Sequence, residues 1–230
     1  MPILGIADAG ALMTDMTLGE GIALLQRRGA LVKGLLVAGL VVIPLVLFGE
    51  VAEFYGHVSL AEDAPVEGLN ALYLGVSAVG ILLELTTSVI FCMWIYRAAA
   101  NIKAAHARGF TFTPAWAVGW HFVPIANFFR PYQAMRQIWA VSHGGDSDSL
   151  RSGNGLLIGW WGLWSFSIMV SILMNMAAFN AASPAEEREI LILSMLYSSI
   201  NLFLYPLAIR LVDRVTVAQR DRLTAAQIFT

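Results

Sequence analysis

The chain has 230 residues, of which 58% are hydrophobic and 13% are charged, and its mean hydropathy is +0.69. Soluble globular proteins carry about twice that share of charged residues, because their surfaces must be hydrated. The composition therefore excludes an ordinary soluble domain and indicates a polytopic membrane protein. A disulfide scaffold within the chain is also excluded, since Cys92 is the single cysteine.

Four apolar stretches are long enough to cross a bilayer core of about 30 Å as helices. They cover roughly residues 30–49, 72–94, 156–179 and 190–212. We therefore expect an all-α fold with four transmembrane helices in a membrane domain over residues 30–212, between an N-terminal segment (1–29) and a tail (213–230). Ahead of the first span, Thr17 and Glu20 have the spacing of a capping box, which predicts the start of a short amphipathic helix.

Basic residues near membrane spans are retained on the cytoplasmic side, so their distribution predicts orientation. Thirteen of the 14 lysines and arginines fall on one side of the predicted spans: Arg27, Arg28, Lys33, Arg97, Lys103, Arg108, Arg130, Arg136, Arg151, Arg210, Arg214, Arg220 and Arg222. The other side has Arg188 and two acidic loops, which we place at residues 50–67 and 186–189. We expect both termini in the cytoplasm and anionic lipid around the basic flanks.

Residues 113–130 form a shorter apolar segment with Pro124 in its middle. It is too short for an ordinary span, and a crossing here would move the basic residues that follow to the outer side. Pro131 suits the first turn of a helix, and the apolar and polar residues after it separate onto two faces. We predict that residues 113–140 form a re-entrant or interfacial segment on the cytoplasmic side. A longer span kinked at Pro124 is the alternative.

Glu84 is the only charged residue deep within a predicted span. A carboxylate at that depth is costly and should face the interior between the helices. Ser88 follows on the same helix face, and Ser167, Tyr197 and Asn201 lie at similar depth on the third and fourth spans. We predict an intramembrane polar network of these five residues, with Glu84 hydrogen-bonded to Asn201 or Tyr197. The network either joins the helices through a neutral carboxylic acid or carries a proton or cation.

A distinctive order of aromatic, proline, amide and arginine residues runs from the end of the second span through the short apolar segment. Its members are Arg97, Asn101, Trp116, Trp120, Pro124, Asn127, Arg130, Pro131 and Tyr132. In this order the segment resembles the bacterial membrane-protein family called domain of unknown function 4328. The resemblance implies a membrane fold in the inner membrane of a bacterium and no particular activity. We interpret Arg97, Asn101, Asn127 and Arg130 as a polar clasp that holds the half-inserted segment, with a ligand-recognition site made from the same motif as the alternative.

The sequence lacks the phosphate-binding loop, the nucleophile elbow and the zinc-protease helix motif, so we do not expect an enzyme. The four histidines lack metal-ligand spacing, and we expect no metal and no cofactor. A haem or chlorophyll-type pigment on His121 is an alternative. The scattered basic residues do not predict nucleic-acid binding.

Three functions remain open at this stage. The first is a non-enzymatic subunit or scaffold that docks on a larger membrane complex or associates with itself. The second is a small transporter or channel that uses the network around Glu84. The third is a lipid- or pigment-binding protein that uses the tryptophan-rich cytoplasmic side.

Overall fold

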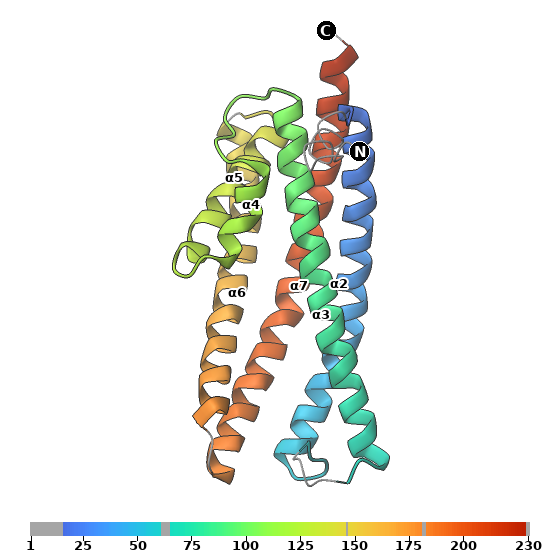
Figure 1. Cartoon of the computed structure of the whole chain (residues 1–230), viewed down its shortest axis with the longest axis vertical. Helices are drawn as coiled ribbons and strands as arrows, with labels where there is room; N and C mark the ends of the chain where they lie inside the picture. The colour runs from blue at the N-terminus through green and yellow to red at the C-terminus, as the bar shows by residue number, and fades with distance from the viewer. Residues whose placement is uncertain (1–15, 61–64, 146, 181–182, 229–230) are drawn as a thin grey trace, which may run out of the picture. The chain divides into compact units, whose positions relative to one another are not determined.

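The structure is a computed structural model that describes residues 16–60, 65–145, 147–180 and 183–228 (Figure 1). These residues form α-helices and short 3-10 helices, with no strand among them. The long helices are α2 (Leu18–Phe54), α3 (Gly68–Ala104), α6 (Ser147–Asn180) and α7 (Pro184–Ile228). The short ones are α4 (Pro114–Gly119), η1 (Trp120–Phe122), η2 (Ala126–Phe128) and α5 (Arg130–Ser142). The all-α prediction is confirmed.

Each of the four long helices contains a stretch apolar enough to cross a membrane. The four predicted spans lie within α2, α3, α6 and α7, in that order. Every helix is longer than the span predicted from hydropathy, and α2 begins at Leu18 instead of near residue 30. Hydropathy marks the part of a helix that suits lipid, whereas the backbone hydrogen bonds continue into more polar residues at both ends.

Side-chain caps fix the first residues of two of these helices. The Thr17 backbone N–H donates to Oε2 of Glu20 at 2.9 Å, and the Glu20 N–H donates to Oγ1 of Thr17 at 3.3 Å. Ser183 and Glu186 cap α7 in a similar way, because the Glu186 N–H donates to Oγ of Ser183 at 3.4 Å. The capping box predicted at Thr17 is therefore present. The separate short helix predicted after it is wrong, since α2 continues unbroken to Phe54.

Residues 113–130 do not form a long helix. Thr113 caps α4, its Oγ1 accepting the Trp116 N–H at 3.2 Å, and two 3-10 turns then follow the six residues of α4. Pro124 lies between η1 and η2, where the backbone turns. The alternative of a kinked fifth span is therefore wrong, because it requires helical structure on both sides of Pro124 over the length of a membrane crossing.

The chain divides into two compact units. Unit 1 comprises residues 1–30, 92–152 and 214–230, and unit 2 comprises residues 31–91 and 153–213. Each of the four long helices contributes residues to both units.

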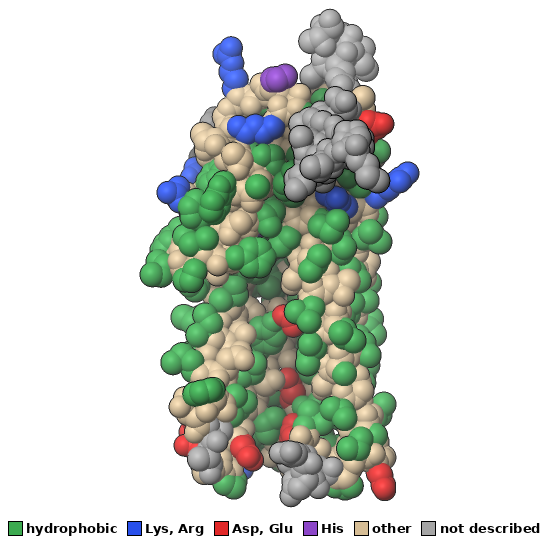
Figure 2. Space-filling view, in the orientation of Figure 1, with side chains coloured by type: hydrophobic (Ala, Val, Ile, Leu, Met, Phe, Trp, Pro, Cys, Tyr) green, Lys and Arg blue, Asp and Glu red, His purple; other side chains and the backbone are tan. Residues whose placement is uncertain are grey.

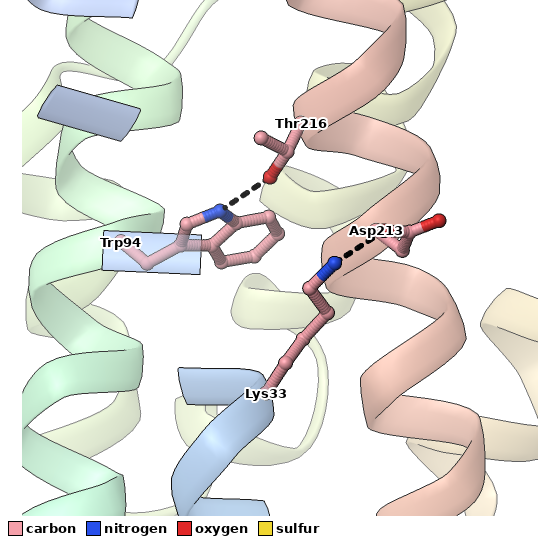
Figure 3. Close-up of polar contacts among 4 residues, drawn as sticks. All are labelled: Lys33, Trp94, Asp213 and Thr216. Carbon is pink, nitrogen blue, oxygen red and sulfur yellow. Dashed lines mark hydrogen bonds and ion pairs between the residues drawn. The ribbon is translucent and has the colours of Figure 1, made fainter. Parts of the chain in front are cut away.

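Unit 1 has a core of aromatic and aliphatic side chains, among them the fully buried Trp94, Ile138 and Trp139. The indole N–H of Trp94 on α3 donates to Oγ1 of Thr216 on α7 at 3.0 Å (Figure 3). The apolar face of α5 is buried in this core, which corrects the expectation that this face lies in the membrane interface. Amphipathic spacing alone does not tell whether a helix packs on protein or on lipid.

Unit 2 has large apolar side chains on its outer surface, and hydrophobic side chains cover much of the view in Figure 2. Phe48, Leu82 and Phe203 are among the exposed ones. Such a surface is costly in water and suits contact with lipid tails. Several polar side chains of its helices line a common cavity instead, and they form the candidate site.

Candidate functional site

The predicted contact between Glu84 and the fourth span is present in unit 2. The hydroxyl of Tyr197 on α7 donates a hydrogen bond to Oε1 of Glu84 on α3. Asn201, one helical turn further along α7, donates its side-chain N–H to the Tyr197 carbonyl at 3.0 Å. Asn201 thus supports the backbone that carries Tyr197, whereas Tyr197 makes the contact with the carboxylate.

A second carboxylate, Glu50, lies in the same unit and is only 3% exposed. We expected it in an acidic loop outside the membrane, but α2 continues past it to Phe54. Its Oε1 accepts hydrogen bonds from Ser198, at 3.0 Å, and from Ser194. Its Oε2 is buried and has no hydrogen-bond partner among the described residues. Glu50 is therefore an inward-facing helix residue.

Both carboxylates line one cavity of about 690 Å³. Four helices of unit 2 contribute to its walls, and acidic side chains are visible in a hollow of the surface in Figure 2. The polar residues around it include Ser77, Ser88, Asn175, Ser194, Ser198 and Asn201, and the aromatic ones are Tyr73, Tyr197 and Tyr205. No Lys, Arg or His is found among its described lining residues. The cavity is acidic, aromatic and within the length of the membrane-spanning helices.

Four of the five residues of the predicted network line this cavity, namely Glu84, Ser88, Tyr197 and Asn201. Ser167 is buried elsewhere in unit 2 and is not part of the lining. Sequence reasoning missed Glu50, although α2 carries a signal for it. Gly39, Ile43, Val46 and Glu50 recur at helical spacing and form one face of α2, which lines the cavity.

Two glycines of α2 allow tyrosine rings to approach the helix backbone. A side chain at Gly39 would collide with the ring of Tyr205, and one at Gly49 would collide with the ring of Tyr73. Small residues let neighbouring elements approach closely within membrane domains. The glycines therefore help to place two of the three tyrosines that line the cavity.

The single described lysine of unit 2 has an acidic partner away from the cavity. Lys33 on α2 forms an ion pair of 2.5 Å with Oδ1 of Asp213 on α7 (Figure 3). Neither residue lines the cavity. This pair therefore does not neutralise Glu50 or Glu84 by direct contact.

The family-like motif in unit 1 separates into two sets of contacts. Nε of Arg97 donates to Oδ1 of Asn101 at 2.9 Å, and Nδ2 of Asn101 donates to Oε1 of Gln219 at 3.2 Å and to the Gly21 carbonyl at 3.3 Å. Gln219 in turn donates to the Ala98 carbonyl at 3.0 Å and to Oγ of Ser142 at 3.1 Å. This buried network joins α2, α3, α5 and α7.

The second set lies within residues 113–133. Nδ2 of Asn127 donates to the His121 carbonyl at 3.4 Å, and Nη1 of Arg130 donates to Oε1 of Gln133 at 3.2 Å. The guanidinium of Arg130 also lies 5.5 Å from the centre of the Trp120 ring, which is 4.6 Å from that of Trp116. The prediction that Arg97, Asn101, Asn127 and Arg130 form one clasp is therefore wrong. Arg97 and Asn101 belong to the network of the long helices, and Asn127 and Arg130 make separate contacts. Pro131 is buried in the first turn of α5, beside Tyr132.

His121 is the residue proposed for an alternative pigment site. Its Nδ1 lies 3.0 Å from the Val118 carbonyl. Burial lowers the pKa of His121, and this contact opposes the shift. No group of three His, Cys, Asp or Glu residues suited to a metal ion occurs in the described part of the chain. Ligation of a pigment would have to use Nε2 of this one histidine, and it stays a hypothesis.

Comparison with curated proteins and with solved structures finds no match. A family model, described as a domain of unknown function (DUF4328), matches residues 59–217. This range covers most of the chain and includes α3, the motif of unit 1, α6 and the part of α7 that lines the cavity. The chain belongs to this DUF4328 family, and its four long apolar helices make it a membrane-spanning helical protein.

Proposed function

We propose that this protein is a small transporter or channel that passes a proton or a small cation through the cavity of unit 2. The observation that carries the proposal is the presence of two carboxylates, Glu50 and Glu84, in one membrane-depth cavity without a basic residue in its described lining. Ionisable residues inside membrane domains are costly, and where they face a cavity they commonly serve ion or proton pathways.

The cavity favours this function over a scaffold or a complex subunit. The scaffold hypothesis rests on the lack of catalytic motifs and on a tryptophan-rich surface, and neither identifies a partner. A helix pair that needs only adhesion can use small residues and hydroxyls at close contact. An acidic space of about 690 Å³ instead supports a site that takes a solute.

The test is flux through the purified full chain in liposomes. Currents on a solid-supported membrane would be recorded after addition of protons, Na⁺, K⁺ and small organic cations. We expect current for at least one of these ions, and we expect Ser77→Phe, which adds a ring to a cavity-lining position, to abolish it. Val79→Phe adds the same ring on the exposed face of α3 and is the control. Folded protein without current for any ion would contradict the proposal.

We also infer an orientation in which unit 1 faces the cytoplasm. Unit 1 contains 11 of the 14 basic residues, whereas unit 2 contains only Lys33, Arg188 and Arg210. In a Cys92→Ser background, an impermeant thiol reagent added to intact cells should label His57→Cys and leave Arg108→Cys unlabelled. The reverse pattern would overturn the orientation.

A further inference from the structure

Glu50 has one carboxylate oxygen that is satisfied and one that is not. Oε1 accepts hydrogen bonds from Ser194 and Ser198, while the buried Oε2 has no partner among the described residues. A buried polar atom without a partner costs free energy in either protonation state, because an ionised oxygen lacks a donor and a protonated one lacks an acceptor. Oε2 of Glu50 therefore lacks a hydrogen-bond partner that a ligand could supply.

No basic side chain lines the cavity beside Glu50 in the described part of the chain. Glu50 lies beside α7 and lines the cavity that also contains Glu84, Tyr73 and Tyr205. The carboxyl of Glu84 is engaged by the hydroxyl of Tyr197. The titratable groups around the cavity are thus carboxyls and phenols, and an added positive charge would meet attraction from both carboxylates.

The size and walls of the cavity indicate what kind of cation it suits. A volume of about 690 Å³ lies in the range of small-molecule sites and far exceeds one dehydrated metal ion. Ca²⁺ needs six to eight oxygen ligands, and the described residues offer no cluster of three acidic or other metal-binding side chains. Val42, Val46, Leu83 and Met174 add apolar surface, and the tyrosine rings add faces that attract cations.

We propose that Glu50 binds the ammonium group of a small organic amine. The ammonium N–H donates a hydrogen bond to Oε2 of Glu50, while the apolar part of the amine occupies the tyrosine-lined cavity. The site uses the cavity of the proposed function and names its ligand class. An ammonium supplies the missing donor, the positive charge and a body that matches the walls. An alkali ion supplies only the charge.

The experiment is calorimetric titration of the detergent-purified full chain with 2-phenylethylammonium. We expect binding of one molecule per chain. The uncharged control compound, 2-phenylethanol, should bind at least about tenfold more weakly, because it cannot make the charge-assisted hydrogen bond. Glu50→Gln should weaken 2-phenylethylammonium binding by a similar factor. Glu189→Gln is the control, at an exposed position of α7 outside the cavity lining.

A second pair of variants covers the case in which Glu50→Gln fails to fold. Ser77→Phe should abolish binding by occupying the cavity, and Val79→Phe should not. Equal affinity of Glu50→Gln, equal affinity for 2-phenylethanol, or heat of binding with Na⁺ or K⁺ but none with 2-phenylethylammonium would each overturn the amine site.

The two proposals can fail separately. Binding of the amine at Glu50 without current in liposomes would leave the site intact and contradict transport. Current carried by alkali ions or protons, without amine binding, would leave transport intact and contradict the amine site.

Discussion

Ser198 on α7 donates a hydrogen bond of 3.0 Å to Oε1 of Glu50 on α2, across a separation of 148 residues in sequence. Ser194 lies one helical turn earlier and donates to the same oxygen. Residues four apart share a helix face, so both hydroxyls reach one carboxylate without a bend in α7. The pair holds the Glu50 side chain against α7 and joins two of the helices that line the cavity.

Replacement of both serines by alanine should destabilise the protein. The change removes both donors from a buried carboxylate oxygen, and such a loss typically costs about 1–3 kcal/mol. Thermal unfolding in detergent should show a lower midpoint for Ser194→Ala/Ser198→Ala. Ser199→Ala is the matched control, because its hydroxyl donates to the Met195 carbonyl of its own helix. An unchanged midpoint in the double variant would mean that these bonds contribute nothing to stability.

Tyr197→Phe and Glu84→Gln should separate stability from transport. The first variant removes the hydroxyl that donates to Glu84. It should lower the free energy of unfolding by about 1–3 kcal/mol, and the unfolding midpoint should fall with it. The second keeps a carbonyl that accepts the same bond, so it should unfold near the wild-type temperature. If Glu84 carries protons, however, Glu84→Gln should lose current in liposomes. Full current in a folded Glu84→Gln protein would limit Glu84 to a structural role.

The spans and the polar faces of α3 and α7 could be predicted from sequence, because apolar length and helical periodicity determine both. Glu50 was missed although it continues the helix face of Gly39, Ile43 and Val46, since a charge at the end of an apolar stretch looks like the start of a loop. Only the continuation of α2 to Phe54 turns it inward. Gln219 carried no such signal, because the hydrogen-bond partners of this lone amide in a polar tail lie far away in sequence.

Asn101 and Gln219 should be energetically coupled. Both are fully buried, and the 3.2 Å bond between them belongs to a network that satisfies several backbone and side-chain groups. Each alanine variant should lose about 1–3 kcal/mol of stability, and the double variant should lose less than the sum. Gln133→Ala, at an exposed position of α5, is the control. Strict additivity in unfolding measurements would show that the two amides act independently.

His143 should make unit 1 less stable in mild acid. Its ring stacks on Trp139, with 4.1 Å between ring centres. Burial lowers the pKa of His143, contact with the Trp139 carbonyl opposes this, and the charges of Arg214 and Arg222 lower it further. The folded chain therefore binds fewer protons than the unfolded chain, so stability should fall as pH drops below about 6.5.

The measurement is the unfolding midpoint between pH 7.5 and 5.5. His143→Gln should show a smaller decline than wild type, because one titrating group has been removed. His57→Gln, at an exposed position, should decline as wild type does. Equal declines in all three proteins would exclude a contribution from His143.

The turn at Ile125 should contact lipid. Ile125 has φ of 65°, and the Ala126 N–H donates to the Pro124 carbonyl at 2.7 Å, which together describe a γ-turn that is rare for a β-branched residue. At and around this turn, Phe122 is 74% exposed, Ile125 is 78% exposed and Phe129 is 61% exposed. Transfer of each such side chain from water to an apolar phase is worth about 1.5–3 kcal/mol.

Neighbouring residues suit the boundary between lipid tails and headgroups. Trp116 and Trp120 have rings of the kind that favour this boundary, and Arg130 beside Trp120 suits an anionic headgroup. A fluorophore on Ile125→Cys in a Cys92→Ser background should be quenched by lipids with spin labels near the top of the acyl chain. The same fluorophore on Arg108→Cys, an exposed polar position of unit 1, should be quenched much less. Equal quenching at the two positions would show that residues 122–129 do not enter the membrane, and the strained turn would then need another partner to cover its apolar side chains.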